Sequence, residues 1–191
     1  MKKLIFAALA AVVLSVSVAE ASSDSWSEDT GYVGIFYPYI AFRGDNEPNN
    51  GGGAGIRLGG MKGSVFGAFL SAFRTTHDDG TSQKAVFTGV TADLKLSLPL
   101  FRVVAPYGSA GLGRYVLENS QTVFRGNQDG FLGINGYQVG AGLDFHLSEL
   151  FTLAVGYTQR RMEFDRGIPA GKSEIWQQVS EYDVELAVHF H

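Results

Sequence analysis

The segment 179–191 alternates between polar and apolar side chains from one residue to the next. One face of such a strand carries three carboxylates, and the other carries an apolar row that begins at Tyr182 and ends at Phe190. With a rise of about 3.3 Å per residue and a tilt near 40°, these two aromatic residues would stand roughly 20 Å apart in height. This separation matches the apolar band between two aromatic girdles, so the segment predicts a strand between lipid and a polar lumen.

The same alternation recurs upstream. The segment 134–147 has a second pair of aromatic residues on its apolar face, and so does 103–117, where we expect Tyr107 and Tyr115 to face lipid and Arg114 the lumen. The alternation does not assign faces to the first three apolar segments. The whole pattern predicts eight strands, at 31–42, 53–61, 64–74, 85–98, 103–117, 134–147, 151–161 and 179–190.

Short and long connections alternate between these strands. The turns around 62–63, 99–102 and 148–150 are tiny, whereas the other connections are long and polar. An even number of strands with this alternation closes an antiparallel barrel whose short turns lie in the periplasm and whose long loops lie outside. The sequence therefore predicts an all-β fold, an eight-stranded antiparallel up-and-down transmembrane β-barrel. A soluble, lipocalin-like eight-stranded barrel is the structural alternative.

The N-terminus has the form of a secretory signal peptide. A basic start at 1–3 precedes an apolar run at 4–18 that is too short to span a bilayer comfortably. Residues 19–21 read Ala-Glu-Ala, the small-x-small form of a cleavage site. We expect a signal peptide at 1–21, cleavage after Ala21 and one exported barrel domain at 22–191.

Composition removes several classes of function. The chain has no cysteine, which excludes a disulfide framework, a thiolate metal site and a cysteine-linked lipid anchor. It has 15 Lys and Arg against 19 Asp and Glu, so it lacks the basic surface of a nucleic-acid-binding protein. No glycine-rich phosphate-binding loop precedes a predicted helix, which excludes the common nucleotide-binding folds.

Three segments, 106–113, 137–148 and the terminal strand that ends at Phe190, resemble the small eight-stranded outer-membrane barrels of the OmpA/OmpX type, in the outer membrane β-barrel domain family. The resemblance covers essentially the whole mature chain. It implies a monomer in the outer membrane of a Gram-negative cell, with outer-membrane lipids, lipopolysaccharide and the barrel assembly machinery as partners. It implies that Phe190 is the assembly signal, although His191 follows it here. Because the family includes anchors, adhesins, resistance factors and a few enzymes, the resemblance specifies fold more than activity.

The interior of such a barrel is just wide enough for side chains to fill it. We expect inward charges of both signs to pair across the lumen and plug it, with Arg160 as the best partner for the carboxylates of the last strand. The predicted lumen charge network is Arg57, Asp93, Lys95, Arg114, Asp144, Arg160, Glu181, Asp183 and Glu185. The predicted aromatic girdle is Tyr107, Tyr115, Tyr137, Phe145, Phe151, Tyr157, Tyr182 and Phe190.

Candidate chemistry is weak by comparison. His146 and Ser148 resemble the His-x-Ser arrangement of outer-membrane lipid A deacylases, but they adjoin a periplasmic turn, at the far end from lipid A. His146, His189 and His191 would lie near the periplasmic rim without a metal-ligand spacing. The Asp-Gly pairs of the outer loops are better explained as turns than as calcium loops. We therefore assign no catalytic, cofactor or metal site and expect a structural or surface-interaction role, with a narrow pore for ions or small solutes and a lipid-modifying enzyme as alternatives.

Overall fold

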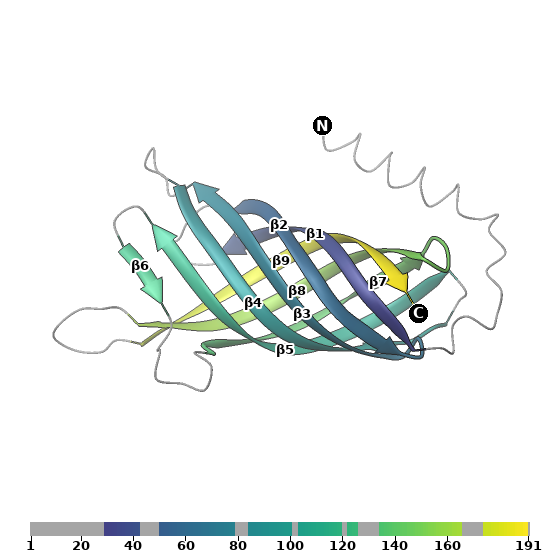
Figure 1. The fold of residues 1–191 in the computed structure, drawn as a ribbon. Coiled ribbons are helices and arrows are strands. Elements are labelled where there is room, and N and C mark those ends of the chain that lie inside the picture. Colours follow the sequence, from purple (N-terminus) through teal and green to yellow (C-terminus); the bar gives the residue numbers. More distant parts are fainter. Residues whose placement is uncertain are drawn as a thin grey trace.

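The computed structural model describes residues 29–42, 50–78, 84–100, 103–119, 122–125, 134–165 and 174–190, and these form a single antiparallel sheet (Figure 1). Alternating patterns of inward and outward side chains produce its strands. In chain order they are β1 Thr30–Phe42, β2 Gly51–Lys62, β3 Phe66–Asp78, β4 Lys84–Ser97, β5 Val104–Asn119, β6 Thr122–Arg125, β7 Gly136–His146, β8 Phe151–Asp165 and β9 Glu174–Phe190.

The sheet closes on itself as a barrel of eight strands. β1 pairs with β9 from Gly31↔Phe190 to Phe42↔Val179, and β4 pairs with β5, so every one of the eight long strands has two neighbours. β6 is the exception, because it pairs only with the end of β5 and forms a short hairpin within the predicted loop 118–133. The predicted eight-stranded antiparallel up-and-down barrel is confirmed, and β6 is an addition to it.

The short turns and the paired ends of β1 and β9 lie at one end of the barrel, and the long connections leave the other. The β2–β3 turn requires Gly63, whose φ of 55° falls in the left-handed region that favours glycine. The β7–β8 turn is held by Ser148, whose Oγ accepts hydrogen bonds from the backbone N–H groups of Leu150 and Phe151 at 3.3 and 3.1 Å. We call these the periplasmic and extracellular ends.

Two strand pairs are longer than the sequence pattern predicted. β3 continues to Asp78 rather than 74, and the β8–β9 ladder continues to the pair Asp165↔Glu174, although the prediction ended β8 at 161 and began β9 at 179. The prediction stopped where the apolar face stops. Backbone hydrogen bonds continue beyond that point because a strand that projects past the apolar band needs no lipid-facing side chains.

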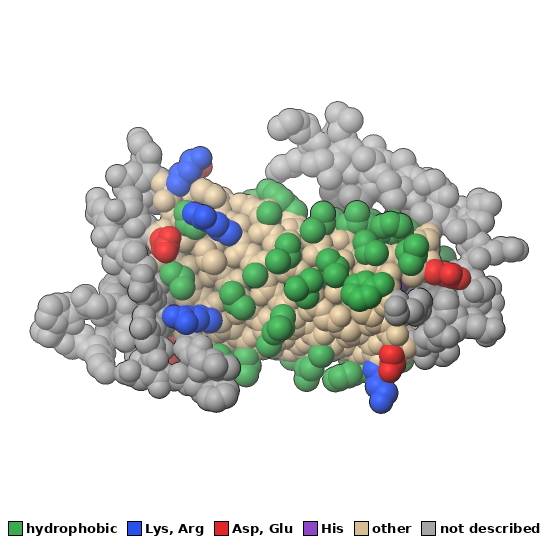
Figure 2. Space-filling model, in the orientation of Figure 1, with side chains coloured by type: hydrophobic (Ala, Val, Ile, Leu, Met, Phe, Trp, Pro, Cys, Tyr) green, Lys and Arg blue, Asp and Glu red, His purple; other side chains and the backbone are tan. Residues whose placement is uncertain are grey.

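The outer wall of the barrel is apolar around its middle. Large side chains such as Ile35, Leu70 and Leu94 are more than half exposed, and Figure 2 shows hydrophobic side chains over this region, with charged ones toward the two ends. Such a band is the expected surface of a barrel in lipid. No helix among the described residues is long and apolar enough to cross a membrane.

Candidate functional site: the barrel interior

The interior is built from three groups of side chains, and the first two interleave, since Ile40 of the first lies opposite Glu181 of the second and Val179 opposite Arg160 in the strand register. The aromatic plug, in the extracellular half, consists of Phe36, Ile40, Phe73, Ala85, Phe87, Tyr115, Leu117, Met162 and Val179. The charged belt, toward the middle, consists of Arg57, Asp93, Lys95, Asp144, Arg160, Glu181, Asp183 and Glu185. The vestibule, a cavity of about 50 Å³, lies at the periplasmic end between residues that include Thr30, His146 and His189.

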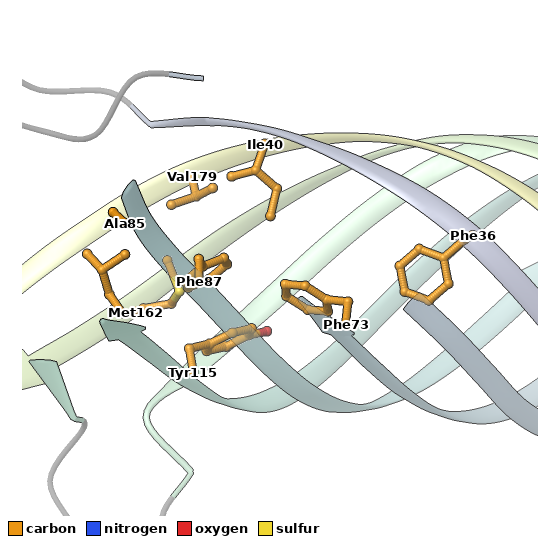
Figure 3. Close-up of a cluster of buried hydrophobic side chains, with 9 residues drawn as sticks. Phe36, Ile40, Phe73, Ala85, Phe87, Tyr115, Met162 and Val179 are labelled. Carbon is orange, nitrogen blue, oxygen red and sulfur yellow. The ribbon is translucent and has the colours of Figure 1, made fainter. Parts of the chain in front are cut away.

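The aromatic plug brings together side chains from six strands, β1, β3, β4, β5, β8 and β9, inside the barrel (Figure 3). Phe87 stacks on Tyr115 with ring centroids 5.8 Å apart, and Phe73 lies 5.6 Å from Phe87. Glycines in the wall make room for these rings, since a Cβ added at Gly89 or Gly113 would lie within 2.5 Å of the Phe73 or Tyr115 ring. Phe87 and Tyr115 are fully buried, and the plug is therefore packed like a protein core.

Glu185 is the centre of the first ion pair of the belt. Its carboxylate is fully buried, forms a salt bridge with the guanidinium of Arg57 and accepts a hydrogen bond from the Tyr32 hydroxyl at 2.9 Å. Arg57 in turn donates through Nε to Ser71 Oγ at 2.9 Å and lies over the Phe36 ring. Both charges are thus paired and oriented, as a buried ion pair requires.

Two further pairs complete the belt. Lys95 Nζ lies 2.8 Å from Asp144 Oδ1 and 4.0 Å from the centroid of the Tyr107 ring. Arg160 forms a salt bridge with Glu181 and also donates to the side-chain oxygen of Gln138. These contacts join strands that are adjacent in the sheet or, for Lys95 and Asp144, strands that flank β5, so they link segments that lie far apart in the sequence.

Gln138 links the Arg160 pair to Asp93, one of the two remaining belt carboxylates. Its amide donates to Asp93, which also accepts from the Thr91 hydroxyl at 2.6 Å, and its oxygen accepts from the Tyr115 hydroxyl at 2.9 Å. The underside of the aromatic plug and the charged belt are therefore one hydrogen-bonded structure.

The belt is not electrically balanced. It contains three cationic and five carboxylate side chains. Among the described residues, the buried Oδ2 of Asp183 and Oε2 of Glu181 have no hydrogen-bond partner. Glu181 is bridged through its other oxygen, whereas Asp183 has no hydrogen bond or salt bridge within the described part of the chain. Asp183 is consequently the weakest element of the belt, because a buried charge without a partner lowers stability.

The structure places eight of the nine predicted lumen charges inside the barrel. Arg114 is the exception, because it is exposed on the outer wall. Tyr115 is fully buried in the plug and Tyr107 contacts Lys95, so the prediction assigned both faces of β5 wrongly. The cause is the glycine and alanine content of β5, which leaves no alternation, so that an eight-residue spacing of inward aromatics was interpreted as a girdle.

The other predicted girdle residues lie on the outer wall. Five of them are at least 36% exposed, and Phe145, half-buried, shares the outward face of β7 with Leu143. The five are Tyr137, Phe151, Tyr157, Tyr182 and Phe190. The aromatic plug itself was missed by the sequence reasoning. The sequence does hold a signal for the plug, because side chains two residues apart lie on the same face of a strand. Phe73 shares its face of β3 with Ser71 and Thr75, and Phe87 shares its face of β4 with Thr91.

The periplasmic residues considered for chemistry form hydrogen bonds to one another. His146 Nδ1 lies 3.0 Å from Thr152 Oγ1, which lies 2.9 Å from His189 Nε2. No three His, Cys, Asp or Glu side chains in the described part of the chain are grouped so as to hold a metal ion. Ser148 caps a turn through its Oγ. His191 and residues 79–80 and 129–130 of the loops considered for calcium lie outside the described residues.

Comparison with known proteins agrees with this geometry. The family model of the outer membrane protein beta-barrel domain matches residues 6–190, nearly the whole chain. The chain belongs to this family. It is therefore an outer-membrane β-barrel protein, as the sequence resemblance implied.

Solved structures show the same fold at low sequence identity. Neisserial surface protein A has a TM-score of 0.64 and 14% identity, over 84% of this chain and 97% of its own. Ail, the attachment invasion locus protein of Yersinia pestis, has a TM-score of 0.52 and 14% identity, over 86% and 99%. OprG of Pseudomonas aeruginosa has a TM-score of 0.52 and 16% identity, over 86% of this chain and 97% of its own. No curated protein matches the chain in sequence.

Proposed function

We propose that this protein is a closed barrel with a structural or surface-interaction role in the outer membrane, and that its interior does not conduct. The observation that carries the proposal is the aromatic plug, in which side chains from six strands meet across the lumen. The protein then acts through its outer wall and the loops at its extracellular end.

Ion passage needs a continuous path of water, and the described interior interrupts such a path twice. The plug contains rings with no exposed surface, and the belt below it is cross-linked by three salt bridges. The vestibule, at about 50 Å³, has room for a few water molecules at one end of the lumen. These features support a lumen that is filled by its own side chains.

Single-channel recording in planar bilayers tests the proposal. The wild type should show no conductance steps, whereas the Phe73→Ala/Phe87→Ala variant should show them, because it removes two adjoining rings of the plug. Conductance of this double variant would show that folded barrels insert into the bilayer and that the plug is the obstacle. Wild-type steps that disappear in Arg160→Gln would instead support the alternative of a narrow pore through the belt.

The alternative of a lipid-modifying enzyme finds little support in the periplasmic residues. Ser148 Oγ is engaged by two backbone N–H groups, and Nδ1 of the nearby His146 lies 3.0 Å from Thr152 Oγ1. A nucleophile needs a base within hydrogen-bond reach. We expect lipid A from cells with and without the protein to give the same mass spectrum, and a difference that depends on His146 and Ser148 would overturn this part of the proposal.

A further inference from the structure

The vestibule contains a buried hydroxyl group that lacks a partner. Ser97, on β4, is 1% exposed, its side chain lines this cavity, and its Oγ has no hydrogen bond among the described residues. A buried hydroxyl without a partner costs free energy, and a ligand that bonds to it removes that cost. The vestibule adjoins the β2–β3 and β7–β8 turns, where Gly63 and Ser148 line it, so a ligand reaches it from the periplasm.

A second hydroxyl group in the vestibule lies between two imidazoles. Thr152, on β8, is 2% exposed, and its Oγ1 lies 3.0 Å from His146 Nδ1 and 2.9 Å from His189 Nε2. A hydroxyl group has one proton, so while both imidazoles are neutral it donates to one of them and accepts the N–H of the other. All three side chains line the same cavity as Ser97. The hydroxyl proton of Thr152 is therefore engaged for as long as the imidazole pair is neutral.

One proton added to the imidazole pair releases this hydroxyl group. Once the second imidazole is protonated, both rings donate to Thr152 Oγ1, and the hydroxyl proton is able to turn into the cavity. The vestibule then presents two O–H donors, from Ser97 and Thr152, beside a positive charge. Because β5 and β7 lie between β4 and β8 in the sheet, the two donors approach the cavity from different sides. Such an arrangement suits the two oxygens of one carboxylate group.

The other titratable side chains of the vestibule are nearly balanced in charge. Lys95 and Asp144, both buried, pair with each other, with Lys95 Nζ 2.8 Å from Asp144 Oδ1. The hydroxyl of Tyr32 is neutral and donates to a carboxylate of the charged belt. Glu149 is exposed in the β7–β8 turn, where water and salt screen its charge. A ligand with a single negative charge is therefore matched by the single proton that the imidazole pair takes up.

The size of the vestibule selects a small ligand. At about 50 Å³ it holds a carboxylate group and little more, and Met61 and the Tyr32 ring supply an apolar part of its wall. We propose that the vestibule binds a small monocarboxylate from the periplasm, together with one proton on the His146–His189 pair. The carboxylate oxygens accept from Ser97 and Thr152, and the short alkyl part lies against the apolar wall. The site is separate from the aromatic plug and does not depend on whether the interior conducts.

A titration with propionate tests the proposal, using the full barrel in detergent micelles, ligand-observed NMR, and empty micelles as the blank. The affinity of the wild type for propionate should rise about tenfold from pH 8 to pH 7, because each bound propionate brings one proton with it. Propionamide, which has the same shape without the charge, should not bind. Changing both His146→Gln and His189→Gln should remove the dependence on pH, since the pair then takes up no proton.

Substitutions of the two hydroxyl groups locate the site. Ser97→Ala and Thr152→Val should each weaken the binding of propionate about tenfold, and Thr152→Ser, which keeps the hydroxyl, should bind as the wild type does. Ser180→Ala is the matched control, because Ser180 is also buried but lies outside the vestibule, beside Tyr157, and it should leave binding unchanged. The gel mobility of unheated samples checks that each variant is folded.

Three results would contradict the proposal, and the first needs no variant. Equal binding of propionate and propionamide by the wild type, or an affinity for propionate that is the same at pH 8 and pH 7, would overturn proton-coupled binding. Undiminished binding by both Ser97→Ala and Thr152→Val would overturn the assignment to the vestibule. Tighter binding of inorganic phosphate than of propionate would overturn the choice of a carboxylate as the ligand.

Discussion

Two carboxylates of β9, Asp183 and Glu185, offer a sharp test of how the charged belt stabilises the barrel. They lie on the same face two residues apart, and each can be changed to its own amide with almost no change in shape. Asp183→Asn and Glu185→Gln alter the net charge of the belt equally. Their surroundings differ, since Glu185 has Arg57 and Tyr32 as partners and Asp183 has a buried oxygen without one.

The expected effects have opposite signs. Glu185→Gln leaves the Arg57 guanidinium without its counter-charge and should lower the free energy of unfolding by about 3 to 5 kcal/mol. Asp183→Asn removes an unpaired buried charge and should raise the free energy of unfolding by about 1 to 3 kcal/mol. Changing Arg57→Met in the Glu185→Gln background should recover most of the loss, because no lone charge then remains.

Urea titration of the barrel in lipid vesicles, read by the difference in gel mobility between unheated and boiled samples, measures these free energies. The midpoint should fall for Glu185→Gln and rise for Asp183→Asn. A rise for both variants would show that only the net charge of the belt matters, and a fall for both would show that Asp183 has a partner. Either result would refute the reasoning from local pairing.

Three further predictions concern the wall, the plug and the C-terminus. Leu143→Arg should lower the free energy of unfolding by about 2 to 4 kcal/mol, and by more in thicker bilayers, because Leu143 faces lipid. Gly140→Arg should instead destabilise the barrel by crowding Ser109, with no dependence on bilayer thickness. Unfolding in vesicles made from lipids of different acyl-chain length measures both effects. Tyr115→Ala should cost about 3 to 5 kcal/mol in the same titration because it empties part of a packed interior. Deleting Phe190 together with His191 should lower the amount of folded protein in the outer-membrane fraction more than deleting His191 alone.

The fold was accessible from the sequence because lipid and lumen impose opposite polarity on alternate residues. In β9 this contrast is clear from residue 181 to 185, and the predicted faces agree with the observed exposure of Tyr182 and burial of Glu181. In β5 the many small residues do not differ in polarity from one position to the next, so the prediction exchanged the lumen-facing and lipid-facing sides of this strand. The extension of β8 beyond residue 161 escaped prediction because backbone pairing, rather than side-chain polarity, defines it.

The lumen charges were predictable by type, but the partners were mostly set by the closure of the barrel. The sequence pointed to Arg160 as the partner of the β9 carboxylates, and it pairs with Glu181. Arg57 and Glu185 lie on β2 and β9, which flank β1 and come together only when β1 pairs with β9 to close the ring. The plug was not predicted because its phenylalanines resemble lipid-facing residues. Only the polar residues two positions away, on the same face of the strand, indicate that they point into the lumen.

The most direct test of the central claim, that the interior is closed, uses the absence of native cysteine. Ser71→Cys places one thiol within the charged belt, at a position that is 4% exposed, and a water-soluble maleimide then reports access to it in the folded, micelle-bound barrel. If the interior is closed, the thiol is not labelled until the protein is boiled, and it is labelled without boiling when Phe73→Ala and Phe87→Ala are added. Prompt labelling of Ser71→Cys alone in the folded barrel would contradict a closed interior.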